Sequence, residues 1–229
     1  MSGSDPDIKV VLIGESGTGK TSIIQRYAYQ IFDPNCASSI SAQYISKKIV
    51  LTDINKTLKM DIWDTAGQEK YRSMAKLFYK DAKIILFVYD ISSIHTFEEL
   101  KNYWCSQIKQ NCEDNILLGV VANKSDLYST QQISNEEGMK FANEIGAIFQ
   151  MTSAKSGIGI DSLFENIGRK YLDPSFDYQK ADKIAEENYN KRKKEKEEAK
   201  RKVELTRRKG VKIGVKNKNK NKTNNGCCN

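Results

Sequence analysis

A glycine-rich stretch near the N-terminus has the residue types and the spacing that bind a chain of phosphates. Residues 14–21 read GESGTGKT and fit the pattern GxxxxGK[ST], after an apolar run and before a helical pattern. The glycines let backbone N–H groups surround phosphate oxygens, and the helix that begins here adds the positive end of its dipole. Lys20 would reach the β- and γ-phosphates, and the Thr21 hydroxyl would bind Mg²⁺. The expected phosphate contacts are Glu15, Ser16, Gly17, Thr18, Gly19, Lys20, Thr21 and Ser22.

A second polar stretch, DIWDTAGQE at residues 61–69, could act on the terminal phosphate. Asp64 stands at the expected end of a strand and suits a Mg²⁺ carboxylate that acts through water. Gly67 can bring its backbone N–H close to a γ-phosphate, and Gln68 can orient a water molecule for in-line attack. We therefore expect Lys20 and Gln68 to be the catalytic residues of a phosphate hydrolysis.

Two later motifs could recognise a base. The sequence NKSD at 123–126 follows an apolar run, and its Asp126 can accept hydrogen bonds from N1–H and the exocyclic amine of guanine. Adenine would leave this carboxylate unpaired, which gives strong discrimination. The Lys124 stem can lie on the base face, and the sequence SAK at 153–155 offers a backbone N–H to guanine O6. The expected base contacts are Asn123, Lys124, Asp126, Ser153, Ala154 and Lys155.

Apolar runs alternate with helical patterns along most of the chain. Strands are expected at 8–14, 44–52, 57–63, 83–89, 116–122 and 147–151. Helices are expected up to about Tyr29 and near 70–80, 93–111, 135–145 and 160–171, and Ser134 with Glu137 has the spacing of a capping box. Continuous apolar strands indicate an α/β fold with a six-stranded, mainly parallel sheet and helices on both faces. The stretch 44–63 looks like a hairpin turning at 53–55, which predicts one antiparallel edge strand.

Charge divides the 229 residues into two parts. Residues 173–229 hold 18 Lys/Arg and 9 Asp/Glu, a net charge of 18 − 9 = +9, whereas residues 1–172 hold 19 and 20, a net charge of −1. We predict a globular domain at 1–172 and a tail at 173–229, in which 178–208 is partly helical and 209–226 disordered.

The single histidine, His95, excludes His-rich metal sites, and we expect it to be solvated or capping. No apolar run is long enough to span a membrane, and no secretory signal is visible.

These motifs, in this order, resemble the Ras superfamily of small GTPases, and within it the Rab branch, over about residues 7–172. Rab-like features are WDTAGQE followed by KYRSM, then FYKDA and FVYDIS. The resemblance implies a P-loop GTPase domain that binds GTP or GDP with Mg²⁺ and hydrolyses GTP slowly, on the order of 10⁻³ s⁻¹ or below. It implies that Phe32 stacks on the guanine edge. It also implies that Tyr44, Trp63 and Phe78 form the surface triad that reports the nucleotide state to effectors.

The segment around residues 39–44, which the resemblance identifies as switch I, departs from the family pattern in two places. The threonine that binds Mg²⁺ in the family falls, by spacing, on Ser39, 18 residues after Thr21. Serine keeps the hydroxyl, so we expect Ser39 to contact the nucleotide and the metal, while switch I should order less firmly. The usual Rab stretch IGVDF reads ISAQY at 40–44, including Ser41, which leaves the set of effectors open. The interswitch and TSAK–GI–LF stretches look like those of the early-endosomal Rabs.

The C-terminus, GCCN at 226–229, resembles the substrates of Rab geranylgeranyl transferase. The resemblance implies lipidation of Cys227 and Cys228 by a prenyl transferase, and transport by a prenyl-binding chaperone. One lipid chain gives marginal membrane binding, whereas two give stable anchoring. The lysines of 209–222 could add about 1 kcal/mol each near an anionic membrane surface. We expect the protein to lie on the cytoplasmic face of intracellular membranes, such as endosomes, and to exchange with the cytosol.

These observations are compatible with three functions. The first is a monomeric GTP/GDP switch in vesicle trafficking, whose partners are an exchange factor, effectors and an activating protein that supplies an arginine in trans. The second is a nucleotide-locked membrane scaffold that does not hydrolyse GTP, which the altered switch I suggests and the intact Gln68 opposes. The third makes the basic segment 178–222 an RNA-binding arm. Its only aromatics are Tyr178 and Tyr189, so we expect no specific nucleic-acid partner.

Overall fold

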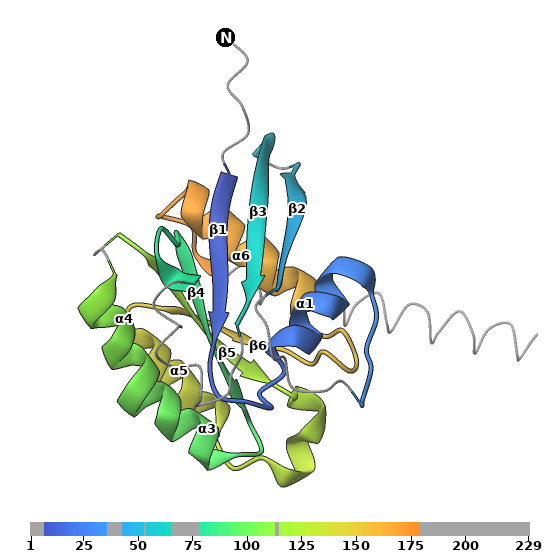
Figure 1. Cartoon of the computed structure of the whole chain (residues 1–229), viewed down its shortest axis with the longest axis vertical. Helices are drawn as coiled ribbons and strands as arrows, with labels where there is room; N and C mark the ends of the chain where they lie inside the picture. Colours follow the sequence, from blue (N-terminus) through green and yellow to red (C-terminus); the bar gives the residue numbers. More distant parts are fainter. Residues whose placement is uncertain (1–6, 36–42, 53, 66–77, 113–114, 179–229) are drawn as a thin grey trace, which may run out of the picture. The chain divides into compact units, whose positions relative to one another are not determined.

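The computed structural model describes residues 7–35, 43–52, 54–65, 78–112 and 115–178 (Figure 1). Its strands are β1 (Asp7–Ile13), β2 (Gln43–Leu51), β3 (Lys56–Asp64), β4 (Ile84–Asp90), β5 (Leu117–Asn123) and β6 (Ile148–Met151). Its helices are α1 (Lys20–Tyr29), α3 (Ile94–Glu99), α4 (Cys105–Asn111), α5 (Asn135–Glu144) and α6 (Ile160–Leu172), with a π-helical turn η2 (Leu100–Trp104) and a 3₁₀ turn η3 (Ser125–Thr130). Each strand begins and ends within one residue of its predicted range.

The strands form one sheet in the order β2-β3-β1-β4-β5-β6. β2 pairs with β3 in antiparallel fashion, and every other neighbouring pair is parallel. The predicted fold class is therefore confirmed, including the antiparallel edge strand. Because parallel strands point the same way, the loops that follow β1, β3, β4, β5 and β6 meet at one edge of the sheet, where ligands bind in open α/β sheets.

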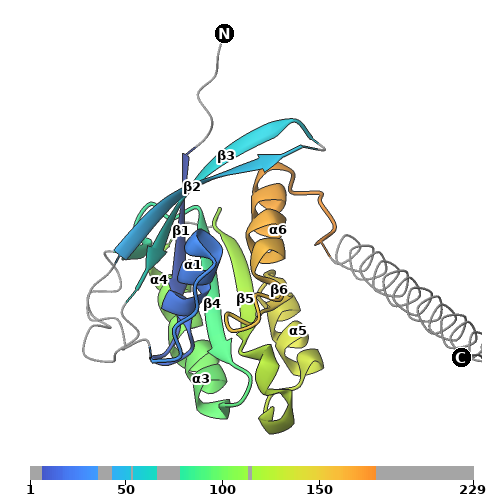
Figure 2. The same ribbon diagram turned by 90° about the vertical axis from the view of Figure 1, so that its right-hand side faces the viewer.

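Helices cover both faces of this sheet (Figures 1 and 2). On one face Val10 and Leu12 of β1 pack in a cluster with apolar residues of α1 and α6. On the other face Val11 and Ile13 pack in a cluster with residues of α3, η2, α4 and α5. Burial on both sides explains why β1 reads as a continuous apolar run rather than as an alternating one.

The predicted helix over 93–111 forms as α3, η2 and α4 in direct succession. The π-helical turn between them was not predicted from the apolar pattern. It places the indole of Trp104 in the core, where Nε1 donates a hydrogen bond to the Glu15 carboxylate, 3.2 Å away. Such turns are frequently found at functional sites. Here the turn connects the middle of a long helix with the glycine-rich loop.

The ends of the remaining helices agree with the local signals. The Ser134 hydroxyl accepts the backbone N–H of Glu137 at 3.1 Å, so the predicted cap of α5 is confirmed. α6 ends at Leu172, and the chain stays on the domain as far as Tyr178, whose hydroxyl accepts the N–H of Phe149. The predicted helix near 70–80 falls mostly outside the described residues, as does the tail beyond residue 178.

Candidate nucleotide-binding site

The loops at the carboxyl edge of the sheet surround a cavity of about 340 Å³. The loop after β1 and the start of α1 form one wall, the chain after α1 forms a second, and the loops after β5 and β6 form a third. The lining residues are Gly17, Gly19, Ser22, Phe32, Asp33, Pro34, Asn123, Lys124, Asp126, Leu127, Ala154 and Lys155. The glycine-rich motif at 14–21 therefore meets, at one cavity, two motifs that lie more than a hundred residues later in the chain, at 123–126 and 153–155.

The glycine-rich loop follows β1 so tightly that side chains are excluded at two positions. A Cβ on Gly14, whose φ is +147°, would lie 2.2 Å from the carbonyl oxygen of Val88. A Cβ on Gly19, whose φ is +92°, would lie 2.4 Å from the Asn123 amide nitrogen. Only glycine allows this loop to approach β4 and β5 so closely. The loop is thereby brought against Asn123 of the NKSD motif.

Lys20 lies buried beneath the same loop. Its ammonium group donates hydrogen bonds to the carbonyl oxygens of Gly14 and Glu15, each at 2.9 Å. Desolvation lowers the pKa of Lys20 to about 8, although the carboxylates of Asp64 and Glu15 partly offset this effect by attraction. Lys20, the candidate for phosphate binding, is therefore a buried cation whose pKa lies only slightly above neutral pH.

Nucleotide affinity should consequently depend on pH through Lys20. Phosphate charges favour the protonated amine, so binding should raise the Lys20 pKa above its value of about 8 in the protein alone. Affinity for GDP should be nearly constant close to pH 7, above the range in which the terminal phosphate titrates, and should fall as the pH rises past 8, by up to about tenfold per unit. Titration of binding between pH 7 and 9 measures this slope. An equal slope in Lys20→Met would show that another group is responsible.

A hydroxyl and a carboxylate stand side by side next to Lys20. Thr21 donates from Oγ1 to Oδ2 of the buried Asp64 at 2.7 Å, although the two residues are 43 positions apart. Paired oxygen donors of this kind are the ligands that Mg²⁺ prefers, usually together with water and substrate phosphates. These residues therefore fit the expected metal. The third expected ligand, Ser39, lies outside the described residues, as do Gly67 and Gln68.

Asn123 holds the loops after β5 and β6 against the glycine-rich loop. Its amide nitrogen donates to the Thr18 carbonyl at 2.8 Å, and its amide oxygen accepts from the Thr152 hydroxyl at 3.0 Å. The side chain is 1% exposed, so no bulk water substitutes for these partners. Asn123 thus joins three segments of the site and lines the cavity as well.

The Asp126 carboxylate is oriented by the third motif. Oδ1 accepts a hydrogen bond from the Ser153 hydroxyl at 2.6 Å, and Oδ2 lies 3.9 Å from the Lys155 ammonium. Lys124 adopts a left-handed backbone conformation and forms a 2.7 Å ion pair with Asp90 at the end of β4. The sequence did not single out Asp90, because its role depends on how β4 and β5 pair.

The family model described as "Ras family" matches residues 9–173, which is most of the chain. The chain belongs to the Ras family of small GTPases. Relatives that it matches include Rab proteins: it is 38% identical to human Rab-22A over 164 residues, which cover 72% of this chain and 83% of that protein. It is 36% identical to human Rab-31 over 170 residues (73% and 86%) and 40% identical to putative Rab-5B of Dictyostelium discoideum over 170 residues (74% and 77%). The predicted Rab branch is confirmed.

An aromatic pair lies on the edge strand β2 and its neighbour β3 in this Rab domain. Tyr44 is 59% exposed and stacks on Trp63 across the β2–β3 ladder, with 5.1 Å between the ring centroids. The ammonium group of Lys9 lies 4.7 Å from the Trp63 ring centroid and donates to the Lys80 carbonyl. Lys9 thereby connects the pair to the segment that follows Phe78, the third aromatic of the expected effector surface.

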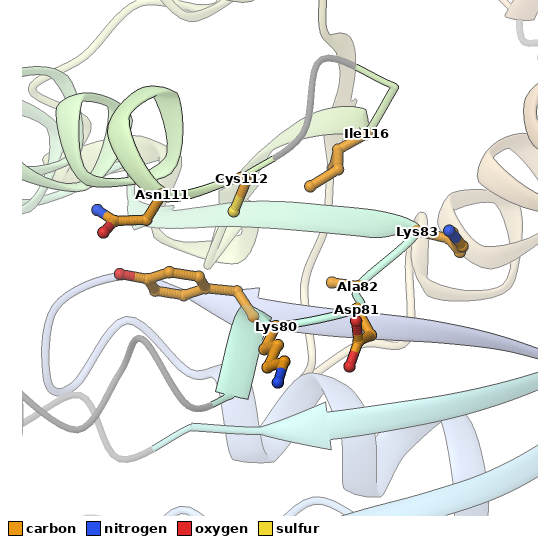
Figure 3. A pocket seen from close by; sticks show the side chains of 8 residues that line it. Lys80, Asp81, Ala82, Lys83, Asn111, Cys112 and Ile116 are labelled. Atoms are coloured by element: carbon orange, nitrogen blue, oxygen red, sulfur yellow. The ribbon is translucent and has the colours of Figure 1, made fainter.

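A second cavity, of about 370 Å³, lies at the C-terminal end of α4 (Figure 3). Its lining residues are Tyr79, Lys80, Asp81, Ala82, Lys83, Asn111, Cys112 and Ile116. None of these residues belongs to a motif that the sequence analysis assigned to nucleotide binding.

Within the described parts of the Rab domain, no helix has the length and apolar character needed to cross a lipid bilayer.

Proposed function

We propose that this Rab protein is a molecular switch that binds GTP and GDP and hydrolyses GTP slowly. The observation that carries the proposal is the single cavity that brings Gly17 and Gly19 of the phosphate loop together with Asp126, Ala154 and Lys155. The lining suits a purine nucleotide, because it combines glycines of the phosphate loop with a carboxylate for the guanine edge.

The proposed chemistry uses positioning and charge. Lys20 and the loop N–H groups would neutralise negative charge that develops on the phosphates, and Gln68 would orient the attacking water. Thr21 and Asp64, with Ser39, would hold a Mg²⁺ ion, which would supply positive charge against the phosphates. We propose that an activating protein supplies an arginine in trans, which explains a slow intrinsic rate.

Single-turnover hydrolysis of bound GTP tests this proposal. The purified protein should hydrolyse GTP at about 10⁻³ s⁻¹ or more slowly, and Gln68→Leu should lower the rate at least tenfold because the water is no longer oriented. GDP release from the variant should be unchanged, which separates hydrolysis from binding. Equal rates for both proteins would instead favour the nucleotide-locked scaffold.

We further propose that the switch regulates vesicle traffic on intracellular membranes, with endosomes as the first candidate. The similarity to Rab-22A, Rab-31 and Rab-5B supports this role, and so does the pair Cys227–Cys228 after a basic segment. The exposed Tyr44–Trp63 pair supports an effector surface on the same domain. An exchange factor, an activating protein, a prenyl transferase and a prenyl-binding chaperone complete the proposed set of partners.

Imaging of an N-terminally tagged protein tests the membrane role. The wild type should label a defined set of organelles, and Cys227→Ser/Cys228→Ser should be diffuse, because loss of both lipid chains removes stable anchoring. The control variant keeps Cys227 and Cys228 and carries Cys112→Ser instead. It should remain on membranes. Diffuse signal from the wild type would oppose the anchored-switch proposal.

A further inference from the structure

Arg26 on α1 makes an unusual set of contacts with the chain beside the cavity. Its Nε donates to the Ala154 carbonyl at 2.7 Å, and its Nη2 donates to the Lys155 carbonyl at 2.8 Å. Its Nη1 donates to the Gln30 carbonyl at 2.9 Å. A guanidinium group is planar and presents its donors in a rigid fork, so it can hold consecutive carbonyl groups in one orientation.

Two of these carbonyls belong to the loop that faces the guanine edge. In a trans peptide the N–H points away from the carbonyl of the same unit. A hydrogen bond that fixes the Ala154 carbonyl toward Arg26 therefore fixes the N–H of Lys155 in the opposite direction. Ala154 and Lys155 both line the cavity, so the orientation of their peptide groups decides which base edge the loop can meet.

The third carbonyl lies at the end of α1. Gln30 caps this helix in the left-handed conformation, with φ of 59°, and its N–H returns to the Arg26 carbonyl at 3.0 Å. The chain then continues directly to Phe32, which also lines the cavity. The other end of the same helix begins with Lys20 and Thr21. One side chain thus joins the base loop to the helix that carries the phosphate- and metal-binding candidates.

We infer that Arg26 is a positioning residue that sets selectivity for purines with an oxygen at C6. The inference rests on the proposed function and adds a residue outside its motifs. Arg26 itself need not touch the base: by holding the Ala154 and Lys155 carbonyls it aims backbone N–H donors at an acceptor. An oxygen at C6 accepts such a hydrogen bond, whereas the amino group of adenine opposes it.

Three diphosphates separate this role from a general loss of structure. GDP and IDP both carry O6, whereas 2-aminopurine riboside diphosphate lacks it. Their dissociation constants are measured for the wild type, Arg26→Gln and Arg26→Lys in the presence of Mg²⁺. We expect Arg26→Gln to weaken the binding of GDP and IDP equally, by about 10- to 100-fold. The affinity for 2-aminopurine riboside diphosphate should change by less than about twofold. Arg26→Lys keeps the charge without the fork and should show a smaller loss with the same selectivity.

The matched control is Arg169→Gln, which removes an arginine of α6 whose guanidinium lies 5.8 Å from the Phe176 ring. It should leave all three constants unchanged. Equal losses for the three diphosphates in both Arg26 variants would overturn the inference, because the role would then be structural. Unchanged constants would overturn it as well. ADP is titrated against the wild type in the same way, and a wild type that fails to prefer GDP over ADP would instead contradict the proposed function.

Discussion

Asp126→Asn is expected to lower the affinity for GDP by about 10³- to 10⁴-fold while raising the affinity for xanthosine diphosphate. A carboxylate offers acceptors to both N1–H and the 2-amino group of guanine, whereas an asparagine amide offers one acceptor and one donor. The amide donor meets the guanine amine unfavourably, but it matches the oxygen at C2 of xanthine. Replacement of the base should therefore compensate for replacement of the residue.

The geometry supports a change of specificity without a loss of the fold. The Asp126 oxygen that accepts from Ser153 at 2.6 Å has a counterpart in the asparagine oxygen, so the side chain should keep its orientation. Dissociation constants for both diphosphates, measured for both proteins, give the coupling directly. Asp161→Asn, at the exposed start of α6, is the matched control and should leave both constants unchanged. Loss of GDP binding without any gain for xanthosine diphosphate would contradict the assigned role of Asp126.

Asn123→Ala should destabilise the domain by about 2–5 kcal/mol and weaken nucleotide binding at least tenfold. The substitution removes the donor to the Thr18 carbonyl and the acceptor of the Thr152 hydroxyl, both in a buried site. Each buried polar group that loses its partner costs about 1–3 kcal/mol. Nucleotide binding should fall in addition, because the glycine-rich loop is no longer held against β5.

Thermal unfolding with and without saturating GDP measures both effects. For a domain of this size, a loss of about 2–5 kcal/mol corresponds to a fall in Tm of about 4–20 °C. Asn166→Ala is the matched control, since Asn166 is a buried asparagine of α6 that donates to the Gln150 side chain at 3.2 Å. It should lower Tm while leaving the GDP dissociation constant unchanged. An Asn123 variant that behaved like this control would show that Asn123 has no special part in the nucleotide site.

Local patterns in the sequence determined the architecture of the described domain. A strand buried on both faces must be apolar at successive residues, so the runs of β1, β4 and β5 were recognisable, and the hairpin of β2 and β3 followed from its turn. The phosphate loop and the NKSD motif were recognisable for a similar reason. The chemistry of each resides in a few neighbouring residues at fixed spacing.

Contacts between distant parts of the chain were decided by the tertiary structure alone. The Asn123–Thr18 bond spans 105 positions, the Arg26–Ala154 bond spans 128, and neither leaves a local pattern. The π-helical turn that brings Trp104 to Glu15 is also invisible locally, because the register of a helix depends on what its side chains meet in the core. Sequence thus determined the elements and their motifs. Packing determined which side chains connect them, since those partners meet only when the sheet has formed.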